Sequence, residues 1–417
     1  MKKRNCIVGQ SGGPTVAINA SLAGIIYKAN QEDKFKNIYG MIHGIKGLLD
    51  RQFISLTDQF TSEDDITSLK NTPAMYLGSC RYKLPTYEEN EEVYIKIFDI
   101  LEELEITDFY YIGGNDSMDT VMKLNAYGTH IQSDICFIGV PKTIDNDLMG
   151  TDHTPGFGSA AKYVATSILE IVHDSLIYKV QSVTIVEIMG RNAGWLTAAA
   201  ALARNAYNDA PDLIYLPEVV FDKQKFLDDI REVFKRKRCI IIAVSEGVKD
   251  ADGHYLDDNS KYVKKDAFGH VLHSGTGKML ESLVFKEFQC KVRSIELNVL
   301  QRCAMHIASK TDIDESFIIG QKAVEASLKG DTGKVIGFKR VSNHPYTTDY
   351  VATDVISVAN MEQKIPIEWI HEDKNDITPK LYEYLFPLIQ GEVPISYRDG
   401  LPQYHSHVHL KTNDTDF

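Results

Sequence analysis

The sequence predicts an α/β protein with two domains, each built on a mainly parallel sheet that helices cover on both faces, and a C-terminal elaboration. The chain has 417 residues, too many for one small core. Several apolar runs end in Gly- or Asp-rich turns and then pass into helical patterns. Uninterrupted apolar strands that alternate with helices are typical of parallel sheets whose two faces are both buried.

The expected strands lie at residues 6–9, 109–114, 135–140, 183–188, 213–217 and 239–244. The first leads through QSGGPTVAIN into a helix that reaches about Lys28. Residues 88–106 and 223–238 have the apolar stripe of amphipathic surface helices. After about residue 340 the patterning weakens, and we expect residues 404–417 to be a peripheral extension. Ligands of such sheets bind beyond the carboxyl ends of the strands, which is where the polar turns fall.

Composition argues against several classes of function. Apolar residues make up 43% of the chain and charged residues 25%, as in ordinary globular proteins. No segment has the pattern of a signal peptide or a membrane-spanning helix, and the six cysteines lack metal-ligand spacing. The formal charge of −13 argues against nucleic acid or an anionic membrane as a partner. We therefore expect a cytoplasmic protein that gathers arginines and lysines locally around any anionic substrate.

Glycine-rich turns follow two of these strands. Gly12 and Gly13 would let backbone N–H groups approach an anion at the start of a helix, although two glycines alone favour a plain strand-to-helix turn. The stretch GGNDSMD (113–119) repeats the arrangement at the next strand. There Asn115 and Asp116 supply oxygens suited to Mg²⁺ that is shared with a phosphate, and helix capping explains the stretch equally well.

A third turn, PKTIDNDLMG (141–150), crowds Lys142, Thr143, Asp145 and Asp147 at the end of a buried strand. Two carboxylates two residues apart in an extended stretch would face the same side, with Thr143 on that side as well. A carboxylate near a hydroxyl acceptor can take up its proton, and a lysine can offset charge on a transferring phosphoryl group. Three anion-suited turns on consecutive parallel strands therefore indicate phosphoryl transfer.

Three other patterns are weaker. HSGTGK (273–278) lacks the spacing of a phosphate-binding P-loop and is followed by Met279 in place of Ser or Thr, so a turn before a helix is favoured. The histidines, including HSHVH (405–409), lack zinc-ligand spacing. GQSGGP does not match GxGxxG and no ribose-binding acid follows at the expected distance, which argues against a dinucleotide oxidoreductase.

Seven motifs occur in the order and spacing found in the phosphofructokinases: SGGPTVAINASLAG, LGSCR, IGGNDSMDT, PKTIDND, VEIMGRNAGW, SEG and RSIELNVLQRCAMH. Over roughly residues 5–310 the chain resembles this family, and the motifs are highly specific as a set. The resemblance implies two Rossmann-like three-layer domains with the site in the cleft between them, and phosphorylation of fructose 6-phosphate at its 1-hydroxyl. It implies a donor domain at 1–141 that part of 300–340 completes, a sugar-phosphate domain at 142–299 and an extension at 340–417.

The resemblance also implies roles for individual residues. Asp145 matches the general base that deprotonates the sugar 1-hydroxyl, and Arg191 is placed to stabilise the transferring phosphoryl group. Asp147 and Asn115 would hold Mg²⁺. Sugar-phosphate contacts are implied for Thr143, Met189, Gly190, Arg191, Glu246, Arg293 and Arg302, the last two at the 6-phosphate. Donor contacts are implied for Gly12, Gly13, Arg81, Gly114 and Asn115.

Asp116 and Lys142 indicate the donor. Family members that use ATP typically have glycine at both positions, whereas members that use diphosphate have aspartate and lysine. An aspartate there places negative charge where the α-phosphate of ATP would lie, and like charges repel in a poorly solvated cleft. A lysine stabilises charge on the leaving phosphate, which matters more for a donor without a nucleoside. We therefore expect a reversible, Mg²⁺-dependent transfer from diphosphate to fructose 6-phosphate, with Asp145, Lys142, Asp116 and Arg191 as catalytic residues.

Two alternatives stay open: an ATP-dependent phosphofructokinase, and a catalytically silent subunit that only binds phosphosugars. The chain also departs from the family pattern. Asn115 replaces an aspartate of ATP-type members at the metal, and Ala17 replaces a donor-loop glycine. Ser182 stands where many members have an arginine that reaches a neighbouring subunit's sugar phosphate, and Val299 replaces a histidine beside the 6-phosphate arginines. We expect a homo-oligomer, either a dimer or a tetramer.

Overall fold

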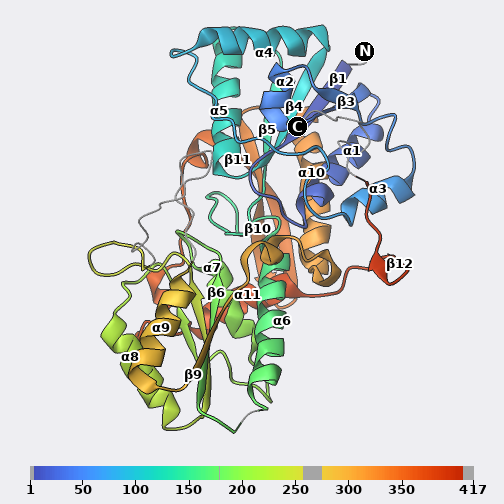
Figure 1. Ribbon diagram of the computed structural model, residues 1–417. Helices are drawn as coiled ribbons and strands as arrows, with labels where there is room; N and C mark the ends of the chain where they lie inside the picture. The colour runs from blue at the N-terminus through green and yellow to red at the C-terminus, as the bar shows by residue number, and fades with distance from the viewer. Residues whose placement is uncertain (1–3, 178, 257–274, 407–417) are drawn as a thin grey trace, which may run out of the picture.

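The computed structural model describes residues 4–177, 179–256 and 275–406, and these form two α/β units that lie one above the other in Figure 1. A seven-stranded sheet with its helices makes one unit, and a four-stranded sheet with its helices makes the other. Most neighbouring strands in both sheets are parallel. The predicted architecture of two Rossmann-like three-layer units is confirmed.

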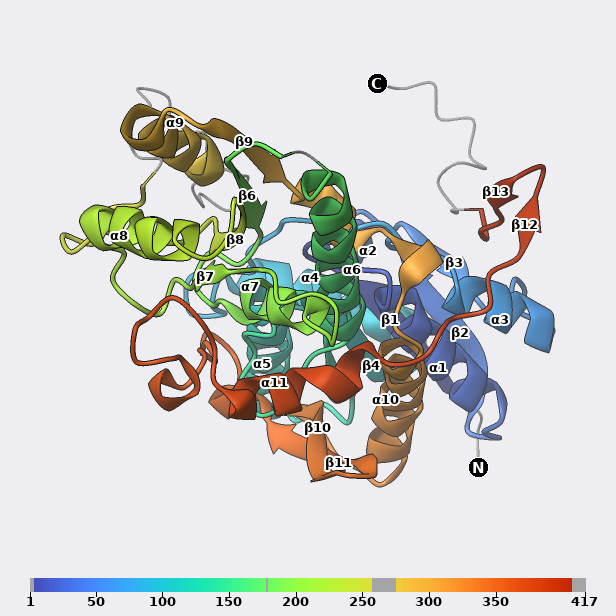
Figure 2. The same ribbon diagram turned by 90° about the horizontal axis from the view of Figure 1, so that it is seen from below.

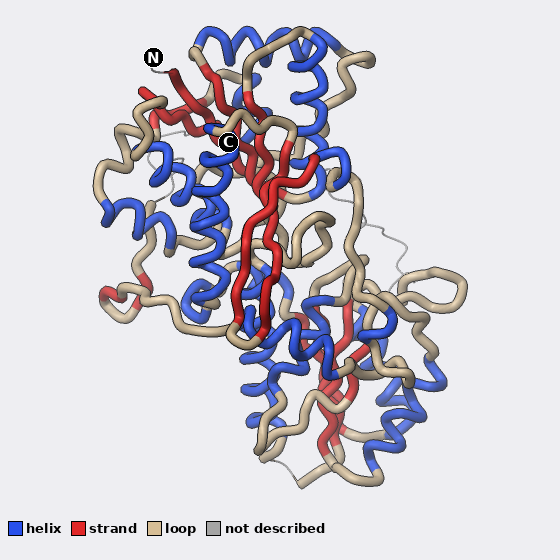
Figure 3. Tube along the Cα trace, turned by 180° about the vertical axis from the view of Figure 1, so that it is seen from behind, coloured by secondary structure: helices blue, strands red, loops and turns tan. Residues whose placement is uncertain are grey.

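The larger sheet has the strand order β11-β10-β5-β4-β1-β2-β3. Its two edge strands, β3 and β11, are the antiparallel ones. The strands are β1 (Arg4–Gln10), β2 (Phe35–Met41), β3 (Phe53–Ser55), β4 (Ile106–Gly113), β5 (Cys136–Pro141), β10 (Lys334–Asn343) and β11 (Tyr346–Asp354). From behind, β10 and β11 form a long two-stranded ribbon that extends from this sheet toward the other unit (Figure 3).

Helices cover both faces of the larger sheet. One face carries α1 (Ile18–Asn30), α3 (Glu63–Lys70) and α10 (Lys310–Leu328), and the other carries α2 (Gly44–Leu49), α4 (Glu91–Glu103) and α5 (Asn115–His130). Successive strand side chains point to opposite faces, so Val8 packs in the first layer and Ile7 in the second. Both layers are apolar, which is why the central strands β1, β4 and β5 contain continuous apolar runs.

Two glycines fix the distance between α1 and α10. A Cβ atom on Gly24 would lie 1.9 Å from the carbonyl oxygen of Phe317, and one on Gly320 would lie 2.1 Å from that of Ser21. The backbones of the two helices therefore touch, which only glycine permits at these positions. In this way a helix from the last third of the chain covers a sheet that begins at Arg4.

The smaller sheet has the order β7-β8-β6-β9 and is parallel throughout. Its strands are β6 (Ser182–Ile188), β7 (Leu213–Tyr215), β8 (Cys239–Ser245) and β9 (Lys291–Glu296). On one face pack α8 (Lys223–Phe234) and α9 (Thr276–Phe288), and on the other α6 (Phe157–Ser175), α7 (Trp195–Ala199) and α11 (Pro379–Leu385). From below, α11 and the segment after it run across from α7 to α10 (Figure 2). A small hairpin, β12 (Tyr397–Arg398) and β13 (Leu401–Pro402), precedes the C-terminus.

The predicted strands and surface helices are confirmed. The helix expected to reach Lys28 is α1, and those expected at 88–106 and 223–238 are α4 and α8. The stretch after residue 340 contributes more than its weak patterning suggests, because β11 joins the main sheet and α11 enters the core. His405 packs against Phe60 and Tyr76, so the tail contacts the body of the protein at this residue. The remaining part of 404–417 and of HSHVH lies outside the described residues, as do the first two residues of HSGTGK.

Within the described ranges, no helix combines the length and apolar content that crossing a membrane requires.

A buried ionic network joins the loop after β5 to the C-terminal part of the chain. His153 is 2% exposed, and its two ring nitrogens lie 2.9 Å from Asp152 Oδ2 and 2.8 Å from Glu315 Oε2. Arg340 donates to Asp152 as well. Two carboxylate partners require that both ring nitrogens donate, which only the imidazolium ion can do. Burial lowers the pKa of His153, but Glu315 and Asp152 outweigh it and raise the pKa to about 9.

We predict that His153 contributes stability that depends on pH. A folded-state pKa of about 9 is above the value of about 6.5 expected in the unfolded chain, so the contribution is full below about pH 6.5 and is lost as pH rises through about 9. Thermal unfolding should show a Tm difference between the parent and His153→Gln that shrinks steadily over this window. A constant difference would mean that His153 is not held as the cation.

Candidate active site

A pocket of about 1000 Å³ lies between the two units. The turns that follow β1, β4 and β5 line one side, and residues that follow β6, β8 and β9 line the other. These are carboxyl ends of parallel strands, where ligands of such folds bind. All three polar turns predicted to act together therefore meet in one cavity.

The first turn lies against Lys142. The Nζ of Lys142 donates a hydrogen bond to the carbonyl oxygen of Gly13 at 2.6 Å. Gly12 has a φ of +82°, and a Cβ atom there would lie 3.0 Å from the same Nζ. The hydroxyl of Ser79 donates to the Gly12 carbonyl oxygen at 2.7 Å. The loop thus needs glycine both for its backbone conformation and to leave room for the lysine.

The second turn begins α5. Gly114 has an extended backbone conformation at the N-cap, and Asn115 and Asp116 line the pocket. The Oδ1 atom of Asn115 is shielded from water and has no hydrogen-bond partner among the described residues. A shielded oxygen without a donor is costly unless a ligand satisfies it. Asp116 is exposed, in contrast to the poorly solvated position that the sequence argument assumed.

The third turn is not extended, because Asn146 has a φ of +57°. Lys142, Thr143, Asp145 and Asp147 nevertheless all line the pocket, as predicted. The Thr143 hydroxyl accepts a hydrogen bond from the backbone N–H of Asp145 at 3.1 Å. The left-handed residue, and not strand alternation, is what brings the two carboxylates into the same cavity.

Burial is the largest influence on the pKa values of the ionisable side chains in this turn. It raises the pKa of Asp145, an effect that nearby Arg191 and Lys142 oppose. It also raises the pKa of Asp147 to about 7, and the negative charges of Asp145 and Glu362 act in the same direction. For Lys142, which is 3% exposed, burial lowers the pKa to about 8, although Asp145 opposes this. The charged form of each of these side chains would be stabilised by a ligand charge of opposite sign nearby.

The motifs VEIMGRNAGW and SEG come from the smaller sheet. Met189, Arg191 and Glu246 line the pocket, while Gly190 has a φ of +128° and donates its N–H to Glu246 Oε1 at 3.3 Å. Burial raises the pKa of Glu246 to about 8, and Asp145 adds to this rise. The Nε of Arg191 is shielded and has no hydrogen-bond partner among the described residues. Gly247 is needed because a Cβ there would lie 1.9 Å from the Arg191 carbonyl oxygen.

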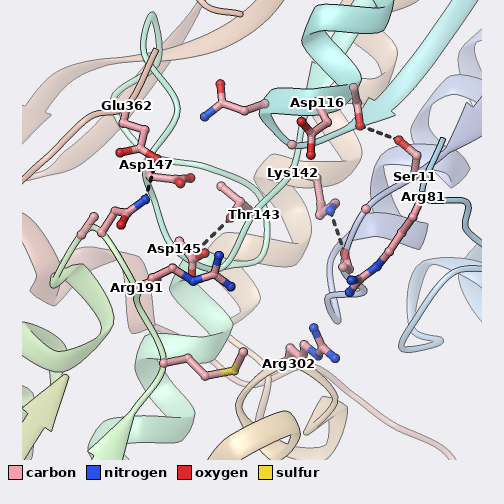
Figure 4. Close-up of a pocket in the computed structure, with 18 of the residues that line it drawn as sticks. Ser11, Arg81, Asp116, Lys142, Thr143, Asp145, Asp147, Arg191, Arg302 and Glu362 are labelled. Atoms are coloured by element: carbon pink, nitrogen blue, oxygen red, sulfur yellow. Dashed lines mark hydrogen bonds between the residues drawn. The ribbon is translucent and has the colours of Figure 1, made fainter. Parts of the chain in front are cut away.

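Four basic side chains surround the centre of the pocket. Figure 4 shows Arg81, Lys142, Arg191 and Arg302 around the space in front of Asp145. Burial and the charge of Arg81 lower the pKa of Arg302. A Cβ on Gly13 would lie 3.2 Å from Arg302 Nη1, so this arginine also reaches the turn that follows β1. The chain thus concentrates positive charge here although its net charge is negative, which suits an anionic substrate.

Arg293 is not in this group. It lies on β9, and its guanidinium donates to Asp174 at 2.8 Å instead of lining the pocket. The expectation that Arg293 and Arg302 share one pocket is therefore not met within a single chain. Ser182 begins β6, and Val299 lines the pocket beside Arg302.

Sequence reasoning missed several lining residues. Ser11 and Ser117, whose hydroxyls are hydrogen-bonded to each other, lie inside motifs that had been noticed, and Asn192 follows Arg191 directly. Asn360 and Glu362 also line the pocket. They follow no strand and belong to no recognised motif, so no sequence signal pointed to them.

Comparisons with known proteins agree with this geometry. A sequence model of the family Phosphofructokinase matches residues 5–327. The pyrophosphate–fructose 6-phosphate 1-phosphotransferases of Halomonas elongata and Xanthomonas campestris pv. campestris are 38% and 40% identical over 406 and 409 residues, each alignment covering 97% of this chain and 96% of the relative. The crystal structure of pyrophosphate-dependent phosphofructokinase from Nitrosospira multiformis has a TM-score of 0.86 at 38% identity and 96% coverage of both chains. The protein belongs to the phosphofructokinase family.

Proposed function

We propose that the protein transfers a phosphoryl group reversibly between diphosphate and the 1-hydroxyl of fructose 6-phosphate, forming fructose 1,6-bisphosphate. The observation that carries the choice of donor is Lys142, which is buried and bonded to Gly13 while it fills the space beside Gly12. A lysine here adds positive charge at the donor loop and takes up room that a larger donor would need. The relatives that align with nearly the full length of the chain are named pyrophosphate–fructose 6-phosphate 1-phosphotransferase.

Asp145 acts as the general base for the sugar hydroxyl. Its pKa, raised by burial, brings the carboxylate closer to the proton affinity that base catalysis needs near neutral pH. The positive charges of Arg191 and Lys142 act on Asp145, and both side chains offset the charge of the moving phosphoryl group. Glu246, which accepts a hydrogen bond from the Gly190 N–H, is placed to form hydrogen bonds with the sugar hydroxyls.

Phosphotransfer in this family needs a divalent cation, and we propose that this cation is Mg²⁺. The cation offsets the charge of the donor oxygens. Asn115 and Asp147 would hold it, and their chemistry fits, because both offer oxygen ligands and the Asn115 oxygen has no other partner among the described residues.

Lys142 contributes more to donor choice than Asp116 does. Asp116 is exposed, so solvent screens its repulsion of an α-phosphate, whereas Lys142 is buried. The ATP-dependent alternative would require the nucleotide to displace this lysine. A silent phosphosugar-binding subunit is disfavoured because Asp145, Lys142 and Arg191 line one pocket, and absence of turnover with either donor would revive it.

We propose that residues 1–141, with part of 300–340, bind the donor, that 142–299 bind the sugar phosphate, and that 340–417 form an extension. The membership of α10 and β10 in the larger unit supports this division. We also propose a cytoplasmic homo-oligomer, a dimer or a tetramer, with no nucleic-acid or membrane partner. The exposed Leu176 and Ile177 near edge strand β9 support self-association, and in such an assembly Arg293 could face a neighbouring subunit.

Replacing the base should abolish most turnover. We predict that Asp145→Asn lowers kcat by about 10²–10⁴-fold, the range for a positioned general base, because the amide cannot accept the proton. Fructose 6-phosphate should still bind, which calorimetric titration can measure on the same preparation. Turnover equal to that of the parent would overturn the role of Asp145.

Removing Arg302 should weaken sugar binding. One charge-assisted contact with a phosphate contributes about 1.5–3 kcal/mol, so Arg302→Ala should raise the KM for fructose 6-phosphate roughly tenfold or more. The KM for diphosphate should change little. Because Arg302 also reaches Gly13, an equal rise for both substrates would assign it to the whole cleft. Arg293→Ala is the comparison variant. A rise in the KM for fructose 6-phosphate equal to that of Arg302→Ala would place Arg293 at the sugar phosphate of a neighbouring subunit.

The roles of Asp116 and Lys142 can be distinguished by comparing four enzymes: the parent, the two single variants and the double variant. We predict that Asp116→Gly increases the ratio of kcat/KM for ATP over diphosphate, because a repulsive charge is removed. Lys142→Gly should lower kcat with diphosphate by about 10²–10³-fold, the usual loss for one electrostatic stabiliser, with little change in sugar binding. The double variant should be slow but favour ATP more than the parent does. The assignment fails if the parent already prefers ATP or if neither change moves the ratio.

A further inference from the structure

The segment 360–363 lies beyond the matched family region, which ends at 327, yet it borders the pocket. Glu362 pairs with Leu148 as an antiparallel bridge, and the N–H of Gln363 donates to the carbonyl oxygen of Asp147 at 2.7 Å. Asn360 donates to Asp119 of α5 at 3.0 Å. The segment is therefore tied both to the third turn and to the helix that starts at the second turn.

These backbone contacts bring Glu362 next to the third turn, where its side chain is exposed to solvent and also lines the pocket. Figure 4 shows the two carboxylates close together on one side of the pocket, with the four basic side chains farther from Glu362 than Asp147 is. Glu362 Oε1 accepts a hydrogen bond from Asn192 Nδ2 at 2.8 Å, which leaves the other carboxylate oxygen available. Two adjacent carboxylates repel each other unless a cation lies between them.

Asn115, which lines the same pocket, adds an independent observation. Its Oδ1 is shielded from water without a hydrogen-bond partner among the described residues, so it needs a ligand, but as an amide it brings no charge. Asp147 would then be the only charged ligand among the two residues proposed to hold the cation. Mg²⁺ is usually bound by one or two carboxylates together with substrate phosphates. A second carboxylate from elsewhere in the chain would supply the charge that Asn115 does not.

We propose that Glu362 is a further residue of the cation site, and that the C-terminal segment thereby completes the place where the metal–diphosphate complex binds. This inference rests on the proposed function. A purely structural role is the competing explanation, in which Glu362 only holds Asn192 and, through it, the loop that carries Arg191. The two explanations differ in whether the charge of Glu362 matters.

Metal binding can be measured without turnover. Mn²⁺ is titrated into the purified protein alone and with diphosphate, in the absence of sugar, and bound Mn²⁺ is followed by electron paramagnetic resonance. Glu362→Gln keeps an oxygen that can accept from Asn192 but removes the charge. We expect it to weaken Mn²⁺ binding in the presence of diphosphate by about tenfold or more, as loss of groups at a metal site commonly does. Raising the metal concentration should then recover part of the lost activity.

Two controls isolate the effect. Asn192→Ala removes the hydrogen bond and keeps the carboxylate, so Mn²⁺ affinity should stay within about threefold of the parent. Glu296→Gln removes a carboxylate from the β9 side of the pocket and should also leave Mn²⁺ affinity nearly unchanged. The inference is overturned if Glu362→Gln binds Mn²⁺ like the parent, or if either control weakens binding equally. Failure of the parent to use diphosphate would instead count against the proposed function, because the Mn²⁺ titration does not depend on turnover.

Discussion

The arrangement of the pocket depends on one buried residue, Asn146, held in a left-handed conformation between the two aspartates of the third turn. Its side chain is fixed from both ends: Nδ2 donates to the Tyr384 hydroxyl at 2.8 Å, and Oδ1 accepts from the Thr154 N–H at 3.0 Å. A positive φ is unfavourable for most residues, and asparagine tolerates it better than others do. Without this turn, Asp145 and Asp147 would not share a cavity with Lys142.

The support for Asn146 comes from far away in the sequence. Tyr384 donates its own hydroxyl proton to the carbonyl oxygen of Asp152, and Arg340 bonds both the Asp152 side chain and the Tyr384 carbonyl oxygen. α11, which carries Tyr384, packs in the same core as Trp195, the first residue of α7, which follows the turn that carries Arg191. The C-terminal part of the chain therefore supports the third turn from behind and reaches the pocket through Glu362. It helps to build the pocket, as the motifs do.

The features that could be predicted from the sequence alone are those that a local sequence pattern determines. The strands β1, β4, β5, β6, β7 and β8 contain continuous apolar runs and could be predicted, whereas β2 and β9 carry polar residues between their apolar ones and were missed. The glycine and aspartate turns after β1, β4 and β5 all line the pocket. Contacts set by distant segments could not be predicted. Glu362 carries no local signal, Arg293 is turned toward Asp174 by the position of α6, and the exposure of Asp116 depends on how the two units meet. The left-handed Asn146 was also missed, because strand alternation was assumed to continue past Pro141.

The contact between α1 and α10 has a consequence for how the protein is made on the ribosome. The apolar face of α1 and the sheet beneath it leave the ribosome early, but the helix that covers them begins at Lys310, and the strand that extends the sheet begins at Lys334. The intervening residues form a separate unit that can complete its sheet first, since its strands span only Ser182–Glu296. The N-terminal unit therefore completes its sheet only after the sheet of the second unit has been synthesised, and until then its nascent form presents uncovered apolar surface to chaperones.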